Sequence, residues 1–446
     1  MVRYIARAWS VVLLLVMVVG QAHARSGGIS LIRDAEIEHT IRAMSTPVWR
    51  AADLDPDSIK IHIVQDNALN AFVAGGQRIF ITTGLLRRVE SPAQLIGVIA
   101  HETGHISEGH LARMPEAMRN ASAQAILSFL LGAAAAVAGS PEAGAAIIAG
   151  GQQAAQSSIL QFSRTQESSA DQAAVTSLDR AGTSPEGLVG FLRILGDQEK
   201  FVPEARDPYL RTHPITRERV AALQTRLTES RFKDKKDLPE QVAALERMRA
   251  KLVGYIEGRD TVLLKYPATD TSIPARYARA FAHYRVGDLP KSLAARPNDP
   301  YFHEFKGQML FEHGRIKEAR APNENAVRLA PHEPLLRVAL AMVLIADENP
   351  ADNRGAIGHL EEATRREPHY GLAWQQLAIA YGRDGQLGLS ALASAERFLL
   401  EGNARDARGQ ADRAQRMLPT GSPAWLRAQD IIDQAAALAA RERQQR

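Results

Sequence analysis

The 446-residue chain contains no cysteine. This excludes disulfide bonds, a metal site built from thiolates, and a lipid attached to a cysteine near the N-terminus. A bound metal ion must therefore use histidine and carboxylate ligands. Absence of cysteine also agrees with an oxidising compartment outside the cytoplasm, such as a bacterial periplasm.

A strong charge imbalance and long apolar runs are missing as well. Lys and Arg together number 54 and Asp and Glu 50, so the sequence gives no reason to expect a nucleic-acid partner. After the N-terminal segment, the apolar stretch at 125–139 is too short for the ~20 residues that cross a bilayer. A membrane-embedded enzyme is therefore disfavoured.

The first 24 residues have the features of a secretory signal peptide. Arg3 and Arg7 precede an apolar run over 11–19, and Ala22-His-Ala24 supplies a cleavage site of the small-x-small type. A membrane anchor is the alternative, but the apolar run is short for a bilayer span. We therefore expect export to the periplasm of a Gram-negative bacterium.

A His-Glu-x-x-His pattern is formed by His101, Glu102 and His105. A helix advances about 100° per residue, so the two histidines share a face and can bind one Zn²⁺. Glu102 could take the proton from a water molecule whose pKa the zinc lowers towards ~7. Apolar residues at helical spacing predict that this helix is buried, which weakens the alternative of two surface histidines. They are Leu95, Val98, Ile99, Ile106 and Leu111.

The residues after this pattern predict a second feature. His110 lies five residues beyond His105, about 140° around a continuous helix, so it is expected to face away from the metal. Residues 121–159 are rich in Ala, Gly and Leu and are interrupted at 139–141. They predict a helical hairpin that either packs on the core or presents an apolar face to a membrane or a client protein.

Two acidic residues, Glu167 and Asp171, are four positions apart, so they share one face of a helix. Glu167 is the predicted third zinc ligand, and Asp171 is expected to hydrogen-bond a ligand histidine. An exposed acidic face is the alternative. Small neighbours favour the site, because they let this helix pack closely against another; they are Ser168, Ser169, Ala170, Ala173 and Ala174.

Three short strands are predicted before the histidine-bearing helix. They span 58–65, 70–74 and 77–82, and Gly75-Gly76 makes the turn between the last two. The prediction is a small antiparallel sheet. An edge strand beside a cleft can pair with an extended substrate through main-chain hydrogen bonds, although an ordinary hairpin is the alternative.

Taken in order, these motifs resemble the CAAX prenyl protease and HtpX-like zinc metallopeptidases over roughly residues 30–260. The resemblance implies a zincin-like α+β domain in which His101, His105 and Glu167 bind one Zn²⁺ and Glu102 is the general base. It also implies that one strand lines the substrate groove. The residues of that strand are Asn70, Ala71, Phe72, Val73 and Ala74.

The stretch from Arg211 to Arg219 contains His213-Pro-x-x-x-x-Arg219, which resembles a loop of the same family. A neutral His213 could occupy the fourth zinc position and hold the enzyme closed. Arg219 could instead stabilise the developing oxyanion. The alternative is a helix start at which Thr212 and His213 only cap.

The C-terminal part has an internal period. Pro297, Pro331 and Pro368 are 34 and 37 residues apart, close to the 34-residue period of tetratricopeptide repeats. Small and aromatic residues recur between them in a similar order. We expect an α-solenoid with a concave surface for peptides or protein partners, a plain helical bundle being the alternative.

The predicted molecule is mainly α. It consists of a signal peptide (1–24), a metallopeptidase domain with a small antiparallel sheet (25–262) and tetratricopeptide-like repeats (263–446). The combination resembles periplasmic members of the family, which implies degradation of unfolded or misassembled outer-membrane proteins, assistance in their assembly, and docking on the barrel assembly machinery through the repeats. The alternative is a repeat-bearing chaperone or adaptor with a structural or permanently latched zinc site, since structural sites are closed by four protein ligands.

Overall fold

The computed structural model describes residues 30–137, 141–199, 213, 217–284 and 298–445. The predicted signal peptide lies outside these residues. The first part of the chain contains β1 (Leu31–Ile32), α2 (Ala35–Ala51), β2 (Lys60–Val64), β3 (Ala71–Ala74), β4 (Arg78–Thr82), α3 (Thr83–Arg88), α4 (Pro92–Ser107), α5 (His110–Val137), α6 (Pro141–Arg180), α7 (Glu186–Glu199), α9 (Arg217–Glu229) and α10 (Pro239–Ile256).

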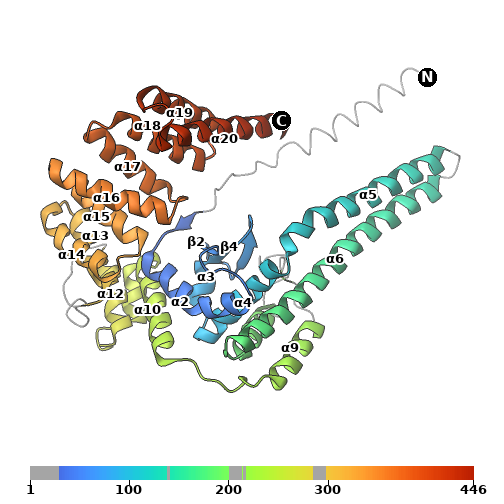
Figure 1. Ribbon diagram of the computed structural model, residues 1–446. Helices are drawn as coiled ribbons and strands as arrows, with labels where there is room; N and C mark the ends of the chain where they lie inside the picture. Colours follow the sequence, from blue (N-terminus) through green and yellow to red (C-terminus); the bar gives the residue numbers. More distant parts are fainter. Residues whose placement is uncertain (1–29, 138–140, 200–212, 214–216, 285–297, 446) are drawn as a thin grey trace.

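Helices make up the rest of the described chain (Figure 1). They are α11 (Arg259–Lys265), α12 (Ile273–Tyr284), α13 (Pro300–Glu312), α14 (Ile316–Leu329), α15 (Pro334–Ala346), α16 (Pro350–Arg366), α17 (Gly371–Arg383), α18 (Leu387–Leu400), α19 (Ala404–Met417) and α20 (Pro423–Gln445). The predicted fold class, mainly helical with a small sheet in the first part, is confirmed.

The sheet has the order β1-β2-β4-β3. Gly75 (φ 60°) and Gly76 (φ 95°) form the predicted turn of the β3–β4 hairpin. However, β2 and β4 run parallel, so the sheet is mixed and the expected purely antiparallel arrangement is wrong. The reason is that β4, which fully buries Ile79 and Ile81, takes a central position, and β3 with its half-buried residues is left at the edge.

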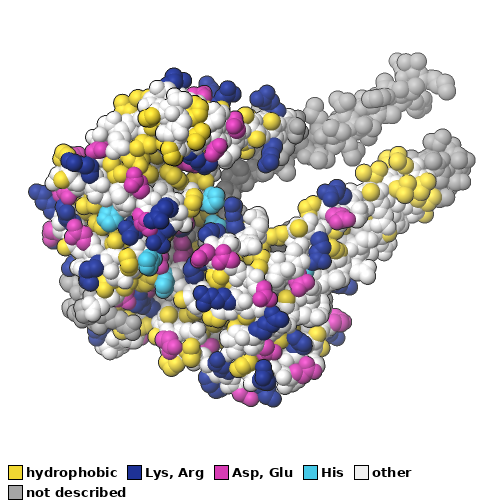
Figure 2. Space-filling model, viewed as in Figure 1, with side chains coloured by type: hydrophobic (Ala, Val, Ile, Leu, Met, Phe, Trp, Pro, Cys, Tyr) yellow, Lys and Arg dark blue, Asp and Glu magenta, His cyan; other side chains and the backbone are white. Residues whose placement is uncertain are grey.

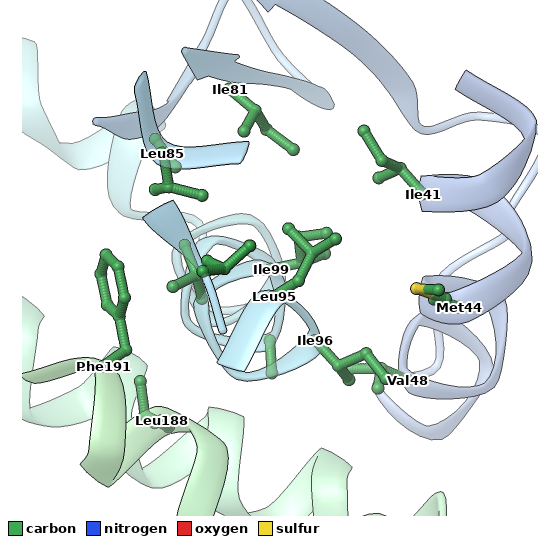
Figure 3. Close-up of a cluster of buried hydrophobic side chains, with 14 of the residues drawn as sticks. Ile41, Met44, Val48, Ile81, Leu85, Leu95, Ile96, Ile99, Leu188 and Phe191 are labelled. Carbon is green, nitrogen blue, oxygen red and sulfur yellow. The ribbon is translucent and has the colours of Figure 1, made fainter. Parts of the chain in front are cut away.

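Helix α4 lies at the centre of the first core. Ser91 caps it, as its side chain accepts a hydrogen bond from the Gln94 N–H, and Pro92 occupies the first turn, as predicted. Apolar side chains of α2, β4, α3, α4 and α7 meet around it (Figure 3). Gly97 touches the α7 backbone so closely that an added Cβ would lie 2.5 Å from the Leu188 nitrogen. Burial of this kind fixes the orientation of the side chains on α4.

Helices α5 and α6 form the predicted hairpin. They lie side by side and extend away from the rest of the protein (Figure 1). The C-terminal half of α6 returns to the core and packs against α4. Within the described residues, no helix combines the length and the apolar character that crossing a membrane requires.

The C-terminal helices pack consecutively, in the pairs α13/α14, α15/α16, α17/α18 and α19/α20 (Figure 1). Gly314 (φ 74°) and Gly385 (φ 76°) stand at turns within two of these pairs, where only glycine enters the left-handed region readily. Assignment of the pairs to tetratricopeptide repeats stays a prediction. The predicted domain boundary at 262/263 falls within α11 and also stays a prediction.

Candidate metal centre

The two histidines of the His-Glu-x-x-His pattern converge from α4. Their Nε2 atoms lie 3.2 Å apart. His101 is fully buried, and the side chain of His105 is only 11% exposed. Helical spacing therefore placed both imidazoles on one face, as expected.

Glu167 reaches the histidines from α6. Its carboxylate oxygens lie 3.3 Å from His101 Nε2 and 3.4 Å from His105 Nε2. The approach depends on small residues, because a Cβ on Gly104 of α4 would lie 2.5 Å from the carbonyl oxygen of Ala170. The small residues around Glu167 thus allow the close helix contact that the sequence predicted.

His213 completes the cluster from a segment before α9. Its Nδ1 lies 3.0 Å from Glu167 Oε1 and 3.3 Å from His101 Nε2. Donor atoms of His101, His105, Glu167 and His213 all lie within 4.8 Å of one another, and all four residues are buried. These residues could hold one metal ion.

The spacing and the charge of the cluster suit a divalent cation. Ligands at ~2.0–2.1 Å in a tetrahedral zinc site are roughly 3.3 Å apart, which matches the donor separations above. Three buried carboxylates surround the site, those of Glu102, Glu167 and Asp171. The cation Arg219 contacts two of them, Glu167 and Asp171. Neutral imidazoles leave an excess of two negative charges, which a dication would balance.

The pKa values respond to that same excess of negative charge. Burial alone lowers the pKa of His101, but its hydrogen bonds with Asp171 and Glu167 raise the pKa to about 10. Burial raises the pKa of Glu167, yet the contact with His213 and the hydrogen bonds from the histidines hold it well below its usual value. When no metal ion is bound, a proton on His101 therefore supplies part of the positive charge that the carboxylates require.

Asp171 and Arg219 contact residues of the cluster from behind. Asp171 Oδ1 lies 2.9 Å from His101 Nδ1, so His101 presents Nε2 to the cluster. Arg219 donates from Nε (2.7 Å) and Nη2 (2.9 Å) to Asp171, and its Nη1 lies 2.8 Å from Glu167 Oε2. The guanidinium therefore contacts two acidic residues of the site, Asp171 and Glu167.

His110 was expected to face away from the metal, and it lies outside the cluster, but it contacts His105, which the sequence did not predict. Its Nδ1 lies 2.9 Å from His105 Nδ1, and the residue is only 3% exposed. Helix α4 stops at Ser107, Gly109 adopts φ 65°, and α5 starts anew at His110, so the angle of a continuous helix does not apply. The glycine after the pattern was the signal that could have revealed this.

His110 thus contacts Nδ1 of His105, as Asp171 contacts Nδ1 of His101. Burial, followed by the nearby His105 and Arg113, lowers the pKa of His110 to about 4. The ring is therefore neutral, and its Nδ1 can accept the proton that His105 carries on Nδ1. His105 Nε2 is then free to bind a metal ion.

Glu102 is fully buried beside the cluster. Within the described residues, neither of its carboxylate oxygens has a hydrogen-bond partner. The closest charged contact is His213 Nε2, at 3.5 Å from Oε1. A buried carboxylate without hydrogen bonds is costly, and such groups in native proteins usually have a functional cause.

The predicted substrate strand is an edge strand next to α4. Within the described chain β3 pairs only with β4, and it contacts α4. Because the Thr82 N–H donates to the Asn70 carbonyl, alternation along the strand directs the N–H groups of Ala71 and Val73 away from β4. These groups are placed where an extended chain could pair with them.

A family model described as peptidase family M48 matches residues 32–227, which include all the residues of the cluster. Over this stretch the chain is similar to the metallopeptidases of that family. This confirms the family resemblance and the assignment as a metalloprotease. The roles of the individual site residues stay predictions.

Two relatives cover about nine-tenths of the chain, and a third covers part of it. The beta-barrel assembly-enhancing protease of Yersinia pestis is 25% identical over 430 residues, which is 91% of this chain and 84% of that protein. The protein of the same name from Escherichia coli K12 is 25% identical over 428 residues, 92% and 85% of the two chains. The mitochondrial metalloendopeptidase OMA1 of Schizosaccharomyces pombe is 25% identical over 174 residues, 39% and 48% of the two chains.

Proposed function

We propose that the protein is a zinc-dependent endopeptidase of the periplasm that degrades misfolded or misassembled outer-membrane proteins and assists their assembly. His101, His105 and Glu167 hold one Zn²⁺ per chain, and Glu102 is the general base. One observation carries this proposal: three converging metal donors stand beside a buried carboxylate that has no hydrogen-bond partner among the described residues. That combination suits hydrolysis better than a structural ion site.

Each side chain of the site has a separate role in peptide hydrolysis. When bound, Zn²⁺ supplies a Lewis acid that polarises the scissile carbonyl and lowers the pKa of water. Glu102 accepts a proton from the attacking water and later transfers it to the nitrogen of the leaving amine. Asp171 and His110 keep His101 and His105 in the tautomers that present Nε2.

Glu102→Gln tests this mechanism, and Glu108→Gln is its matched control. Glu108 is an exposed glutamate at the C-terminal cap of the same helix. We expect Glu102→Gln to keep its zinc and to cleave unfolded casein about 100- to 10 000-fold more slowly, whereas Glu108→Gln behaves as wild type. Cleavage by Glu102→Gln at the wild-type rate would show that the mechanism is wrong.

His213 closes the resting site by occupying the fourth metal position. The proposal rests on its 3.0 Å contact with Glu167 and its 3.5 Å contact with Glu102, since the imidazole fills the space that a water molecule and the substrate carbonyl need. His213→Ala should increase the cleavage of casein or of the chain itself. If neither reaction becomes faster in His213→Ala, the hypothesis that His213 closes the site is wrong. If the zinc-loaded variant is also inert, it favours the second candidate function, a repeat-bearing chaperone or adaptor with a structural zinc site.

Arg219 acts as a positioning residue in this scheme. Its contacts with Asp171 and Glu167 fix both carboxylates relative to the histidines. The alternative role in oxyanion stabilisation requires the guanidinium to leave these contacts. Arg219→Lys distinguishes the two, because loss of positioning weakens zinc binding, whereas loss of an oxyanion contact lowers kcat at unchanged zinc affinity.

Substrates pair with the free edge of β3, whose residues are Asn70, Ala71, Phe72, Val73 and Ala74. Val73→Pro removes an outward N–H without breaking a hydrogen bond to β4, so the fold should tolerate it. We expect slower cleavage of casein by Val73→Pro and near wild-type cleavage by Val73→Ala, which keeps the N–H. Equal rates for the two variants contradict pairing at this edge.

The cellular role follows from the predicted layout and the names of the relatives. The signal peptide (1–24) directs the metallopeptidase domain (25–262) and the repeats (263–446) to the periplasm, where the repeats dock on the barrel assembly machinery. Support comes from the relatives named beta-barrel assembly-enhancing protease, which align over about nine-tenths of this chain. Deleting 387–446, which leaves the contacts of Tyr277 and Asp299 in place, should leave cleavage of casein intact and weaken co-purification with the assembly machinery.

A further inference from the structure

Half of the exposed large apolar side chains among the described residues lie on one element, the α5–α6 hairpin. Figure 2 shows apolar side chains gathered at its far end, beyond the charged ones. The ten on the hairpin are Leu111, Met114 and Met118 near its base, Leu160 midway along α6, and Ile126, Leu127, Phe129, Leu130, Leu131 and Ile147 nearer the tip, with exposures from 38% to 60%. Clustering of this extent marks an interaction surface.

In the distal part of the hairpin, small residues lie between the two helices and large apolar residues face outward. Helices α5 and α6 meet through small residues: Ala121 and Ala155 are buried, and an added Cβ on Gly151 would collide with Ser128. The large side chains at 126, 127 and 129–131 are instead 54% to 60% exposed. At 100° per residue they cover about 200° of α5, opposite Ser128. Small residues at the helix contact and large apolar residues outside are typical of helices surrounded by lipid.

Polarity changes in layers along the hairpin. Glu142 is the sole charged residue in the sequence between Arg119 and Arg164. Exposed arginines (Arg113, Arg119 and Arg164) lie nearest the core, and amide and hydroxyl side chains follow at 120–124 and 152–161. The apolar part comes last. This order matches water, headgroup and hydrocarbon at a membrane surface.

The length of the apolar part fits one leaflet. Residues 126–137 of α5 rise about 17 Å as a helix, and the hydrocarbon of one leaflet is about 15 Å thick. A groove on a protein partner would cover a single stripe of the helix, whereas lipid can surround the whole exposed arc. The basic residues at the base add attraction to anionic headgroups.

From these observations we infer that the tip of the α5–α6 hairpin inserts into one leaflet of a phospholipid bilayer that contains anionic lipid. This property goes beyond the proposed function and does not require the protein to be active. Helix α6 runs from this tip to Glu167, about 20 residues or roughly 30 Å from Ile147. Insertion therefore holds the metal centre near the membrane surface.

Vesicle flotation tests this inference with the full mature chain. Vesicles of phosphatidylcholine with phosphatidylglycerol should carry the protein, and phosphatidylcholine alone should carry less. The double variant Leu127→Gln/Leu130→Gln should bind about 100-fold more weakly. The matched control is Leu264→Gln on α11, the same change at an 83% exposed leucine off the hairpin, which should bind as wild type. Circular dichroism checks that each variant is folded.

A second measurement locates the inserted segment. The hairpin has no tryptophan, so Phe129→Trp provides a fluorescent probe. The emission of this variant should shift to the blue on addition of these vesicles and be quenched by lipids brominated on the acyl chains.

Three results overturn the inference. They are no flotation with either kind of vesicle, equal flotation of the wild type and the double variant, and an emission of the Phe129→Trp variant that lipid leaves unchanged. Concentration-dependent dimers that the double variant abolishes, without vesicle binding, would instead assign the surface to a second copy of the chain.

Discussion

Two of the buried clusters of charged side chains among the described residues are built differently. One is the candidate metal centre. The other joins α2, α10, α12 and α13, where Arg247 contacts Glu36 and Asp299, and Lys251 Nζ lies 2.7 Å from Asp34 Oδ2. The hydroxyl of Tyr277 donates to Glu36 at 2.6 Å. We refer to this second set as the inter-helix cluster.

The difference lies in how negative charge is balanced. In the inter-helix cluster, each of the three carboxylates contacts Arg247 or Lys251, which stay positive because the pKa values of both are raised. At the metal centre, titratable imidazoles replace most of the fixed cations, and Glu102 has no hydrogen-bond partner in the described chain. Carboxylates that each contact a fixed cation indicate a structural role, whereas a larger carboxylate excess among imidazoles indicates a place for a metal ion.

Metal removal should have the largest effect and should act on one cluster alone. We expect a strong chelator to abolish casein cleavage by His213→Ala and added Zn²⁺ to restore it, because Glu102 needs the ion beside it. The inter-helix cluster does not need a metal ion, so the protein should remain folded, as measured by circular dichroism. Full cleavage by protein shown to be metal-free would contradict the account.

Breaking the inter-helix cluster should give the reverse pattern. Arg247→Met leaves Glu36 and Asp299 buried without their guanidinium, which should lower the free energy of unfolding by about 3–5 kcal/mol. Urea denaturation measures this loss, and the zinc content should not change. Adding Glu36→Gln should recover part of the stability. A loss of zinc in the folded variant would show that the two clusters are coupled.

A smaller effect is expected from the partner of His105. His110→Phe keeps the ring shape but cannot accept the His105 proton, so zinc affinity should fall about 10- to 100-fold. Competition with a coloured chelator measures the affinity. His110→Asn places an acceptor oxygen near the same point and should restore much of the affinity. If His110→Phe binds zinc as tightly as wild type, the contact has no positioning role.

The smallest effect concerns a carboxyl group next to the inter-helix cluster. Glu304 lines a cavity of about 400 Å³ together with Lys251, and burial, then the negative charges of Asp34 and Glu36, raise its pKa to about 8. The folded chain keeps a proton that the unfolded chain releases near pH 4.5, so this contribution to stability is lost as the pH rises from about 4.5 to 8.

Glu304→Gln should remove that part of the pH dependence. The expected change is on the order of 1 kcal/mol, since the side chain is partly exposed to the cavity and water screens it. Thermal unfolding at pH 6 and pH 8.5 provides the comparison. An unchanged pH slope in the variant would mean that Glu304 is ionised in the folded protein.

Sequence predicted the parts of the site that depend on local geometry. His101 and His105 share a face because helical periodicity fixes it, and Ser91-Pro92 marks the start of their helix. Glu167 was predicted from its i, i+4 spacing to Asp171 and from its small neighbours, and the family resemblance implied the same role; the structure contains the close helix contact that those neighbours favour.

Features that depend on tertiary contacts were missed. His110 approaches His105 only because Gly109 ends one helix and starts another. The central position of β4 depends on which strands are most deeply buried in the folded sheet. Glu36 and Arg247 are 211 residues apart in the sequence and carry no local signal of their contact. Side chains that meet through chain reversal or long-range packing cannot be paired from periodicity.

The amount of zinc bound per chain tests the central claim most directly, measured by atomic emission on wild type, Glu167→Gln and Glu36→Gln. We predict one zinc ion per chain in wild type and in Glu36→Gln, and a loss of bound zinc in Glu167→Gln, because Glu167 is the proposed ligand and Glu36 belongs to the inter-helix cluster. Stoichiometric zinc at wild-type affinity in Glu167→Gln, or no zinc in the zinc-treated wild type, would contradict the account.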